Sequence, residues 1–151
     1  MLDRTLAAFL QEGVGIHIGS CNDRLEPGGA RALAVTVDDD GTHLVVYMAE
    51  AAARLLPDLA PDRPAAVSFG RPIDDRACQV KGAVVNVRPA EPHERELISA
   101  QFEGFLTNLE RIGIPRAGAT NWPRWPAIAI RLRATAVFEQ TPGPAAGTPL
   151  P

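Results

Sequence analysis

Residues 69–89 contain a long segment in which polar and apolar residues alternate. In an extended chain Gln79 and Lys81 point to one side, and Cys78 and Val80 point to the other. This period of two predicts a β-strand with one polar face and one face toward a core. Lys81 is the only lysine of the chain, because every other basic side chain except the histidines is an arginine. The polar face of this strand is therefore a candidate functional surface.

A second segment with a period of two lies at 128–138, where Arg131, Arg133 and Thr135 face away from a row of apolar side chains. The same reasoning, with Gly- and Asp-rich turns as boundaries, predicts the other strands. The six expected strands are residues 14–21, 31–37, 43–49, 65–69, 76–88 and 128–138. Hairpin connections outnumber helical crossovers, so we expect a mainly β fold with flanking helices, a six-stranded antiparallel barrel that is closed or split.

Three helices are expected beside the barrel, at 2–12, at 51–59 and from Pro92 to about Arg111. The third is the clearest, because its apolar residues recur at steps of three and four and Pro92 stands at its first position. After the last strand the composition changes to the Pro- and Gly-rich sequence QTPGPAAGTPLP. We therefore divide the chain into a barrel domain, 1–139, and a C-terminal tail, 140–151, that is disordered or lies along a partner subunit.

Composition excludes several functions. The net charge of -3 disfavours generic nucleic-acid binding, which normally requires a basic surface. No apolar run approaches the ~20 residues that span a bilayer, and the N-terminal segment lacks the pattern of an export signal. Cys21 and Cys78 are too few for a disulfide framework, and the three histidines are scattered, so no metal site is expected. We expect a cytoplasmic protein without membrane contact.

Three short motifs occur in a fixed order along the strands. The strand RALAVT runs from Arg31 to Thr36, and the next strand ends in Tyr47 and Met48. A helix that contains the triplet Ala52-Ala53-Arg54 follows, and the long strand opens with RACQVKG at 76–82. Together these motifs resemble the FMN-binding split-barrel family typified by pyridoxamine 5′-phosphate oxidase, over roughly residues 9–140.

The resemblance implies an FMN-binding split barrel, a homodimer with the flavin at its interface, and an oxidoreductase acting on a small molecule. In that family an arginine of the first motif and a Ser-Arg-Lys triplet contact the phosphate, so Arg31 and Arg54 are expected there. Gln79 and Lys81 are expected at the polar edge of the flavin ring. The implied cofactor-binding residues are Arg31, Thr36, Tyr47, Met48, Arg54, Gln79 and Lys81.

The sequence also departs from the family pattern. Ala52 and Ala53 replace two phosphate-contacting residues, and the C-terminal substrate-binding signature of the oxidase is absent. Three alternatives therefore remain open: a deazaflavin-dependent protein, a haem-binding protein in which His17 or His93 would ligate iron, and a non-catalytic small-molecule-binding module. No side chain is indicated as a general acid or base. Trp122 and Trp125 either line a ligand site or subunit contact, or fill the core.

Overall fold

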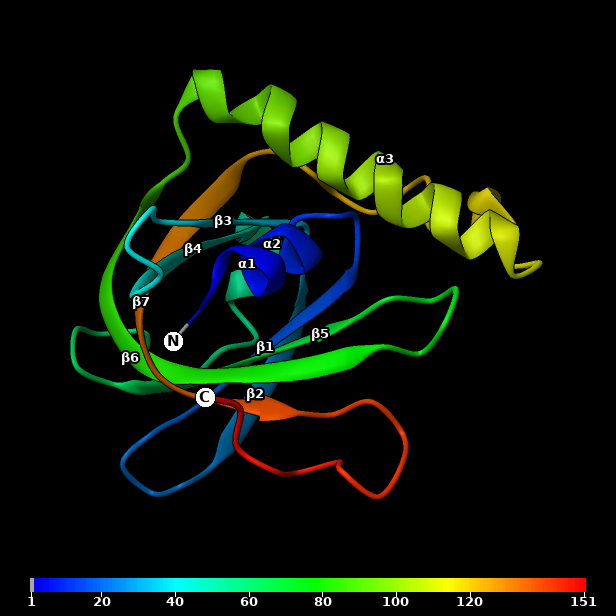
Figure 1. Cartoon of the computed structure of the whole chain (residues 1–151). Coiled ribbons are helices and arrows are strands. Elements are labelled where there is room, and N and C mark those ends of the chain that lie inside the picture. The colour runs from blue at the N-terminus through cyan, green and yellow to red at the C-terminus, as the bar shows by residue number, and fades with distance from the viewer. Residues whose placement is uncertain (1) are drawn as a thin grey trace.

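The structure is a computed structural model that describes residues 2–151, and it is built mainly from β-strands (Figure 1). The strands are β1 (Gly15–Cys21), β2 (Pro27–Ala32), β3 (Ala34–Val37), β4 (His43–Ala49), β5 (Pro64–Gly70), β6 (Ala77–Pro89) and β7 (Ala127–Glu139). The helices are α1 (Arg4–Leu10), α2 (Glu50–Ala53) and α3 (Arg95–Arg111), with short 3-10 helices η1 (Pro92–Glu94) and η2 (Arg116–Gly118).

All seven strands form one antiparallel sheet in the order β2-β1-β5-β6-β7-β4-β3. The two edge strands, β2 and β3, are separated in sequence by Leu33 alone, whose backbone N–H donates to the carbonyl of Tyr47 on β4 at 2.8 Å. Since one residue joins the two edges, the sheet has to curl until they meet. The expected antiparallel split barrel is thus confirmed.

The number of strands corrects the sequence prediction of six. The strand expected at 31–37 is two strands that pair with opposite ends of the sheet, and the break falls at Leu33. Strand β2 also begins at Pro27, ahead of the expected start at residue 31. Alternation continues through both halves, so the sequence carries no signal for the change of partner.

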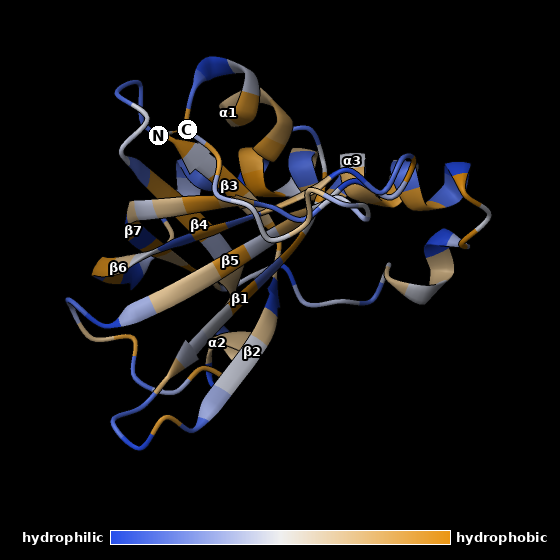
Figure 2. Cartoon of the chain, turned by 60° about the horizontal axis from the view of Figure 1, so that its bottom comes forward, coloured by the Kyte–Doolittle hydropathy of each residue, from blue (hydrophilic) through white to orange (hydrophobic). Residues whose placement is uncertain are grey.

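The barrel interior and the outer face under α3 form two separate cores. Phe9 of α1 packs inside the barrel with side chains such as Phe69, Met48 and Leu132. On the outer face of β3, β4 and β7, small residues including Ala34 and Ala129 pack against α3. The helix therefore covers one half of the outer surface, and within residues 2–151 no helix packs across the outer face of β2, β1, β5 and β6 (Figure 2).

Residues 140–151 turn back onto their own chain. Strand β4 pairs with β7 only as far as Arg133, and beyond that point the tail supplies the neighbour of β7. The backbone N–H of Glu139 donates to Thr148 and that of Leu150 donates to Val137, at 2.9 and 2.8 Å. The Leu150 side chain packs against the barrel core. No described helix is both long and apolar enough to cross a membrane.

A partly buried ion pair ties the start of α3 to the sheet. Glu94 is 8% exposed and accepts two hydrogen bonds from Arg88 of β6, at 2.7 and 2.8 Å, and one from the hydroxyl of Tyr47 at 2.8 Å. The backbone N–H of Glu91 also donates to it at 2.7 Å. The hydrogen bonds from Arg88 lead the effects that lower the pKa of Glu94 from 4.5 to about 2.

This pair predicts an acid-sensitive contribution to stability. Because the folded-state pKa of Glu94 is depressed, its stabilisation is present above pH 4.5 and is lost as the pH falls toward about 2. We expect Glu94→Gln to lower the free energy of unfolding near neutral pH by about 2–4 kcal/mol and to flatten its decline over that window. Urea titrations at several pH values measure both effects. Glu96→Gln, at an exposed acid in the first turn of α3, is the control, and an equal effect there would refute the assignment.

Candidate functional site

Four polar side chains form a row across the uncovered outer face of the sheet. His17 of β1 lies opposite Arg31 of β2 on one side and Ser68 of β5 on the other, and Ser68 lies opposite Gln79 of β6. The residues before and after each of them point into the barrel core, so these four point outward. The row lines an open hollow of about 450 Å³.

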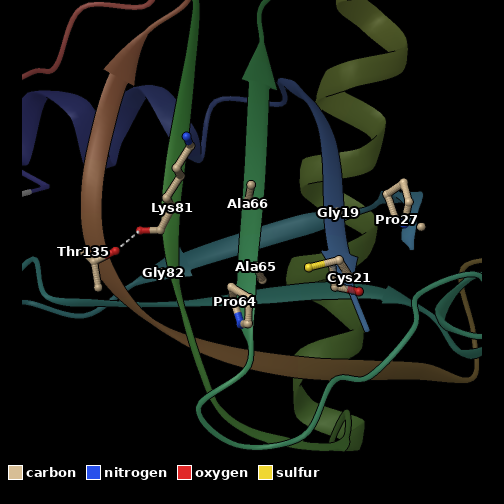
Figure 3. A pocket seen from close by; sticks show the side chains of 11 residues that line it. Gly19, Cys21, Pro27, Pro64, Ala65, Ala66, Lys81, Gly82 and Thr135 are labelled. Carbon is tan, nitrogen blue, oxygen red and sulfur yellow. Dashed lines mark hydrogen bonds between the residues drawn. The ribbon is translucent and has the colours of Figure 1, made fainter. Parts of the chain in front are cut away.

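The next outward row of the same strands is built mostly from residues without large side chains. Gly29, Gly19, Ala66 and Lys81 follow one another across β2, β1, β5 and β6. Gly19 and Ala66 line both the first hollow and a second one of about 430 Å³, whose walls are mostly apolar. Figure 3 shows this second hollow, with Gly19, Ala66 and Lys81 on three neighbouring strands. The face therefore combines a flat floor with polar groups.

Arg31 is the most distinctive group of the row. Its guanidinium carbon lies 4.5 Å from the centre of the Trp122 ring and 5.2 Å from that of Phe105. The side chain is half-buried, and no carboxylate in residues 2–151 forms an ion pair with it. Burial lowers the pKa of the guanidinium. Contact with the two rings restrains the guanidinium and leaves its N–H donors for an external acceptor.

The other members of the two rows have weaker partners. The amide nitrogen of Gln79 donates to the hydroxyl of Ser68 at 3.2 Å. The ammonium nitrogen of Lys81 lies 4.7 Å from the centre of the Phe138 ring, and no described carboxylate pairs with it. Partial burial, together with the charge of Arg31, lowers the pKa of His17, so the neutral imidazole is favoured. The positive charges of Arg31 and Lys81 on this face therefore have no carboxylate partner among the described residues.

A third, smaller hollow of about 170 Å³ adjoins Arg31 on its other side. Its lining residues are Arg31, Leu33, Ala49, Ala52, Trp122 and Pro123. Arg31 is its only charged lining residue, so a ligand group that enters here meets an apolar wall with one guanidinium.

One cluster of metal-ligating side chains occurs outside this face. Asp38, Asp40 and His43 bring three ligand atoms within 4.8 Å of one another. Asp38 is held by Arg131 at 2.5 Å, and Asp40 accepts from both the backbone and the hydroxyl of Thr42. Asp38 is thus engaged by β7, and Asp40 by its own hairpin.

Comparison with solved structures identifies the architecture. HupZ of Group A Streptococcus superimposes with a TM-score of 0.56 at 11% identity, covering 97% of this chain and 100% of that one. A candidate pyridoxamine 5′-phosphate oxidase from Lactobacillus delbrueckii gives a TM-score of 0.54 at 12% identity, covering 91% of this chain and 93% of that one. The chain has the pyridoxamine 5′-phosphate oxidase-like split-barrel fold. No protein-family model matches the sequence, and no curated protein matches it significantly.

In this split barrel the residues suggested by the family motifs do not all gather at one place. Arg31, Gln79 and Lys81 share the open face. Tyr47 is 4% exposed and bonds to Glu94, and Met48 is 0% exposed inside the barrel. Thr36, on strand β3, is half-buried and pairs with Val45 of β4.

Arg54 is exposed at the C-terminal end of α2 and lines none of the three hollows near Arg31. Conversely, Ser68 and Trp122 lie at the face without having been singled out as cofactor contacts. Ser68 shares the outward alternation of Gln79, which is the signal that would have found it. Trp122 comes from a loop distant in sequence, where no periodic pattern marks it.

The proximity of Arg31 to His17 is directly measurable. Arg31→Met removes the cation but keeps an unbranched side chain, so the pKa of His17 should rise toward its ordinary value of 6.5. Burial, the larger cause, remains, and the recovery should be partial. The imidazole resonances of His17 followed by NMR over pH report the shift. Arg133→Met, at an exposed arginine of β7, is the control, and an unmoved His17 in Arg31→Met would contradict the observed pairing.

Proposed function

We propose that the outer face of β2, β1, β5 and β6 binds FMN and that the protein is an FMN-dependent oxidoreductase of a small molecule, acting as a cytoplasmic homodimer. The observation that carries the proposal is Arg31, a half-buried guanidinium in contact with two aromatic rings and paired with no described carboxylate. A phosphate dianion is the ligand that such a fixed fork of donors suits best. The shared fold with a candidate pyridoxamine 5′-phosphate oxidase supports the flavin assignment.

The residues of the face fit the rest of the cofactor. Arg31 and Gln79 are three strand spacings apart, about 14 Å, so a phosphate at one end leaves the floor free for a ring. Gly19 and Ala66 let a planar group approach the sheet closely. Gln79 offers hydrogen bonds at the far end, and the charge of Lys81 favours electron density on the ring. FMN, when bound, supplies hydride or electron transfer, and the protein supplies orientation and electrostatics.

A second subunit would complete the site. Both large hollows are open to solvent in one subunit, whereas a flavin that reacts with a substrate needs walls that hold both molecules. Leu25 and Leu55 are exposed at 79% and 64%, and apolar side chains this exposed suit a subunit contact. We include the homodimer in the proposal for these reasons, and light scattering of the purified protein tests it.

Flavin titration tests the proposal. The protein should quench FMN fluorescence, and Arg31→Ala should weaken binding by ~1–3 kcal/mol, the range for a lost charged hydrogen bond. Arg133→Ala, at an exposed strand arginine off the face, should leave the affinity unchanged. Arg54→Ala tests the second phosphate contact that the sequence indicates, and an unchanged affinity would remove Arg54 from the site. Absence of FMN binding by the parent protein would refute the proposal, and a haem absorption band after purification would favour the haem alternative.

Filling the floor is a complementary test. A Cβ at Gly19 would lie 3.5 Å from the carbonyl oxygen of Gly28, an ordinary contact, so Gly19→Val should fold. Its branched side chain would stand where the two hollows meet, and FMN affinity should fall by at least about tenfold, since ~1.4 kcal/mol of lost contact has that effect. Gly70→Val is the matched control, because a Cβ there meets nothing within 4 Å and Gly70 lines neither hollow. Equal affinities of the two variants would exclude the floor as the flavin site.

A further inference from the structure

The segment that joins α3 to β7, residues 112–126, folds back along α3, and we call it the strap. Two arginines of the strap, Arg116 and Arg124, stand on either side of Trp122 in sequence. Both form ion pairs with the same carboxylate, Glu103 of α3. The Arg124 pair is 2.6 Å long, and Arg116 also reaches Glu110 at 3.1 Å. Glu103 therefore connects two positions of the strap, Arg116 and Arg124, to α3.

Trp122 lies between these two arginines in the sequence and connects the strap to the candidate site. Its ring lies 5.9 Å from that of Phe102, centre to centre, and 4.5 Å from the guanidinium carbon of Arg31. The guanidinium carbon of Arg124 lies 4.6 Å from the centre of the Phe102 ring, and Arg124 also pairs with Glu103. Glu103 and Phe102 together therefore hold the part of the strap that contains Trp122. One of the two aromatic surfaces that fix Arg31 thus depends on a loop, whereas the other, Phe105, belongs to α3 itself.

The charge of Glu103 suits this role. The hydrogen bonds that it accepts from Arg124 and, next in effect, from Arg116 lower the pKa of the carboxyl, so it remains ionised at neutral pH. A single exposed ion pair contributes little, but two arginines on one carboxylate form a network with defined geometry. An anchored strap lowers the entropy that the Arg31 side chain would lose when an anion binds.

We propose that Glu103 is a positioning residue for anion binding at Arg31, acting through the strap and Trp122. The inference rests on the proposed FMN site. It adds a positioning residue that lies outside the residues lining that site. Glu103 touches no ligand in this scheme. Its removal releases Trp122, leaves the Arg31 guanidinium less restrained, and weakens phosphate binding.

The experiment uses Trp125→Phe as its background, so that Trp122 is the only tryptophan. Glu103→Gln should raise the acrylamide quenching constant of Trp122 several-fold and weaken FMN binding by about two- to tenfold, the range for ordering one flexible side chain. Glu110→Gln is the matched control, because it removes only the 3.1 Å contact to Arg116 and leaves both pairs of Glu103. Unchanged quenching and affinity in Glu103→Gln would overturn the proposal.

A double-mutant cycle separates positioning from general destabilisation. If Glu103 acts through Arg31, Glu103→Gln should not weaken FMN binding further in an Arg31→Ala protein, whereas an independent structural effect would be additive. Additive losses would overturn the proposal. Failure of the parent protein to bind FMN would refute the proposed function alone, because the quenching of Trp122 still reports whether Glu103 holds the strap.

Discussion

The single residue between β2 and β3 determines the shape of the molecule. These strands are the two edges of the sheet, and Leu33 alone connects them, so the sheet has no flat conformation compatible with its pairing. Curling gives the sheet an inside and an outside. The inside is filled by α1 and by inward apolar side chains of all seven strands. On the outside, one half is covered by α3 and the other half is exposed. The candidate site lies on the half that stays exposed, where Phe105 of α3 and Trp122 contact Arg31 at its border.

Small residues occur on both halves of the outer surface, but their neighbours differ. Under α3 the sheet presents alanines such as Ala34 and Ala129, which allow the helix to approach and bury its phenylalanines. On the other half, glycines and Ala66 occupy comparable positions, but charged and polar residues stand beside them and no helix arrives. Small residues therefore serve close packing on one side and leave hollows on the other.

The sequence predicted the elements whose signal is local. The apolar stripe of α3 and the outward direction of Gln79 and Lys81 are present in the structure. The period of two in β7 holds through Leu132, but a register shift against β6 reverses it farther along the strand, so that Val137 instead of Phe138 packs in the barrel core. Strand β4, expected at 43–49, is present with those bounds, and both of its faces are buried: Met48 points into the barrel, and Tyr47 lies under α3. The exchange of partners at Leu33 and the contact of Trp122 with Arg31 depend on tertiary packing, which alternation does not encode.

Comparison of two arginines explains why the open face is the site of interest. Arg88 has Glu94 as a bidentate partner, and this pair serves the fold because both charges are satisfied within the chain. Arg31 has aromatic faces, which restrain a guanidinium without neutralising it, and its burial lowers its pKa. A half-buried cation without a counter-ion costs stability, and an anion supplied from outside would recover that cost as binding energy. The same physics that makes Arg31 unfavourable for folding makes it effective for recognition.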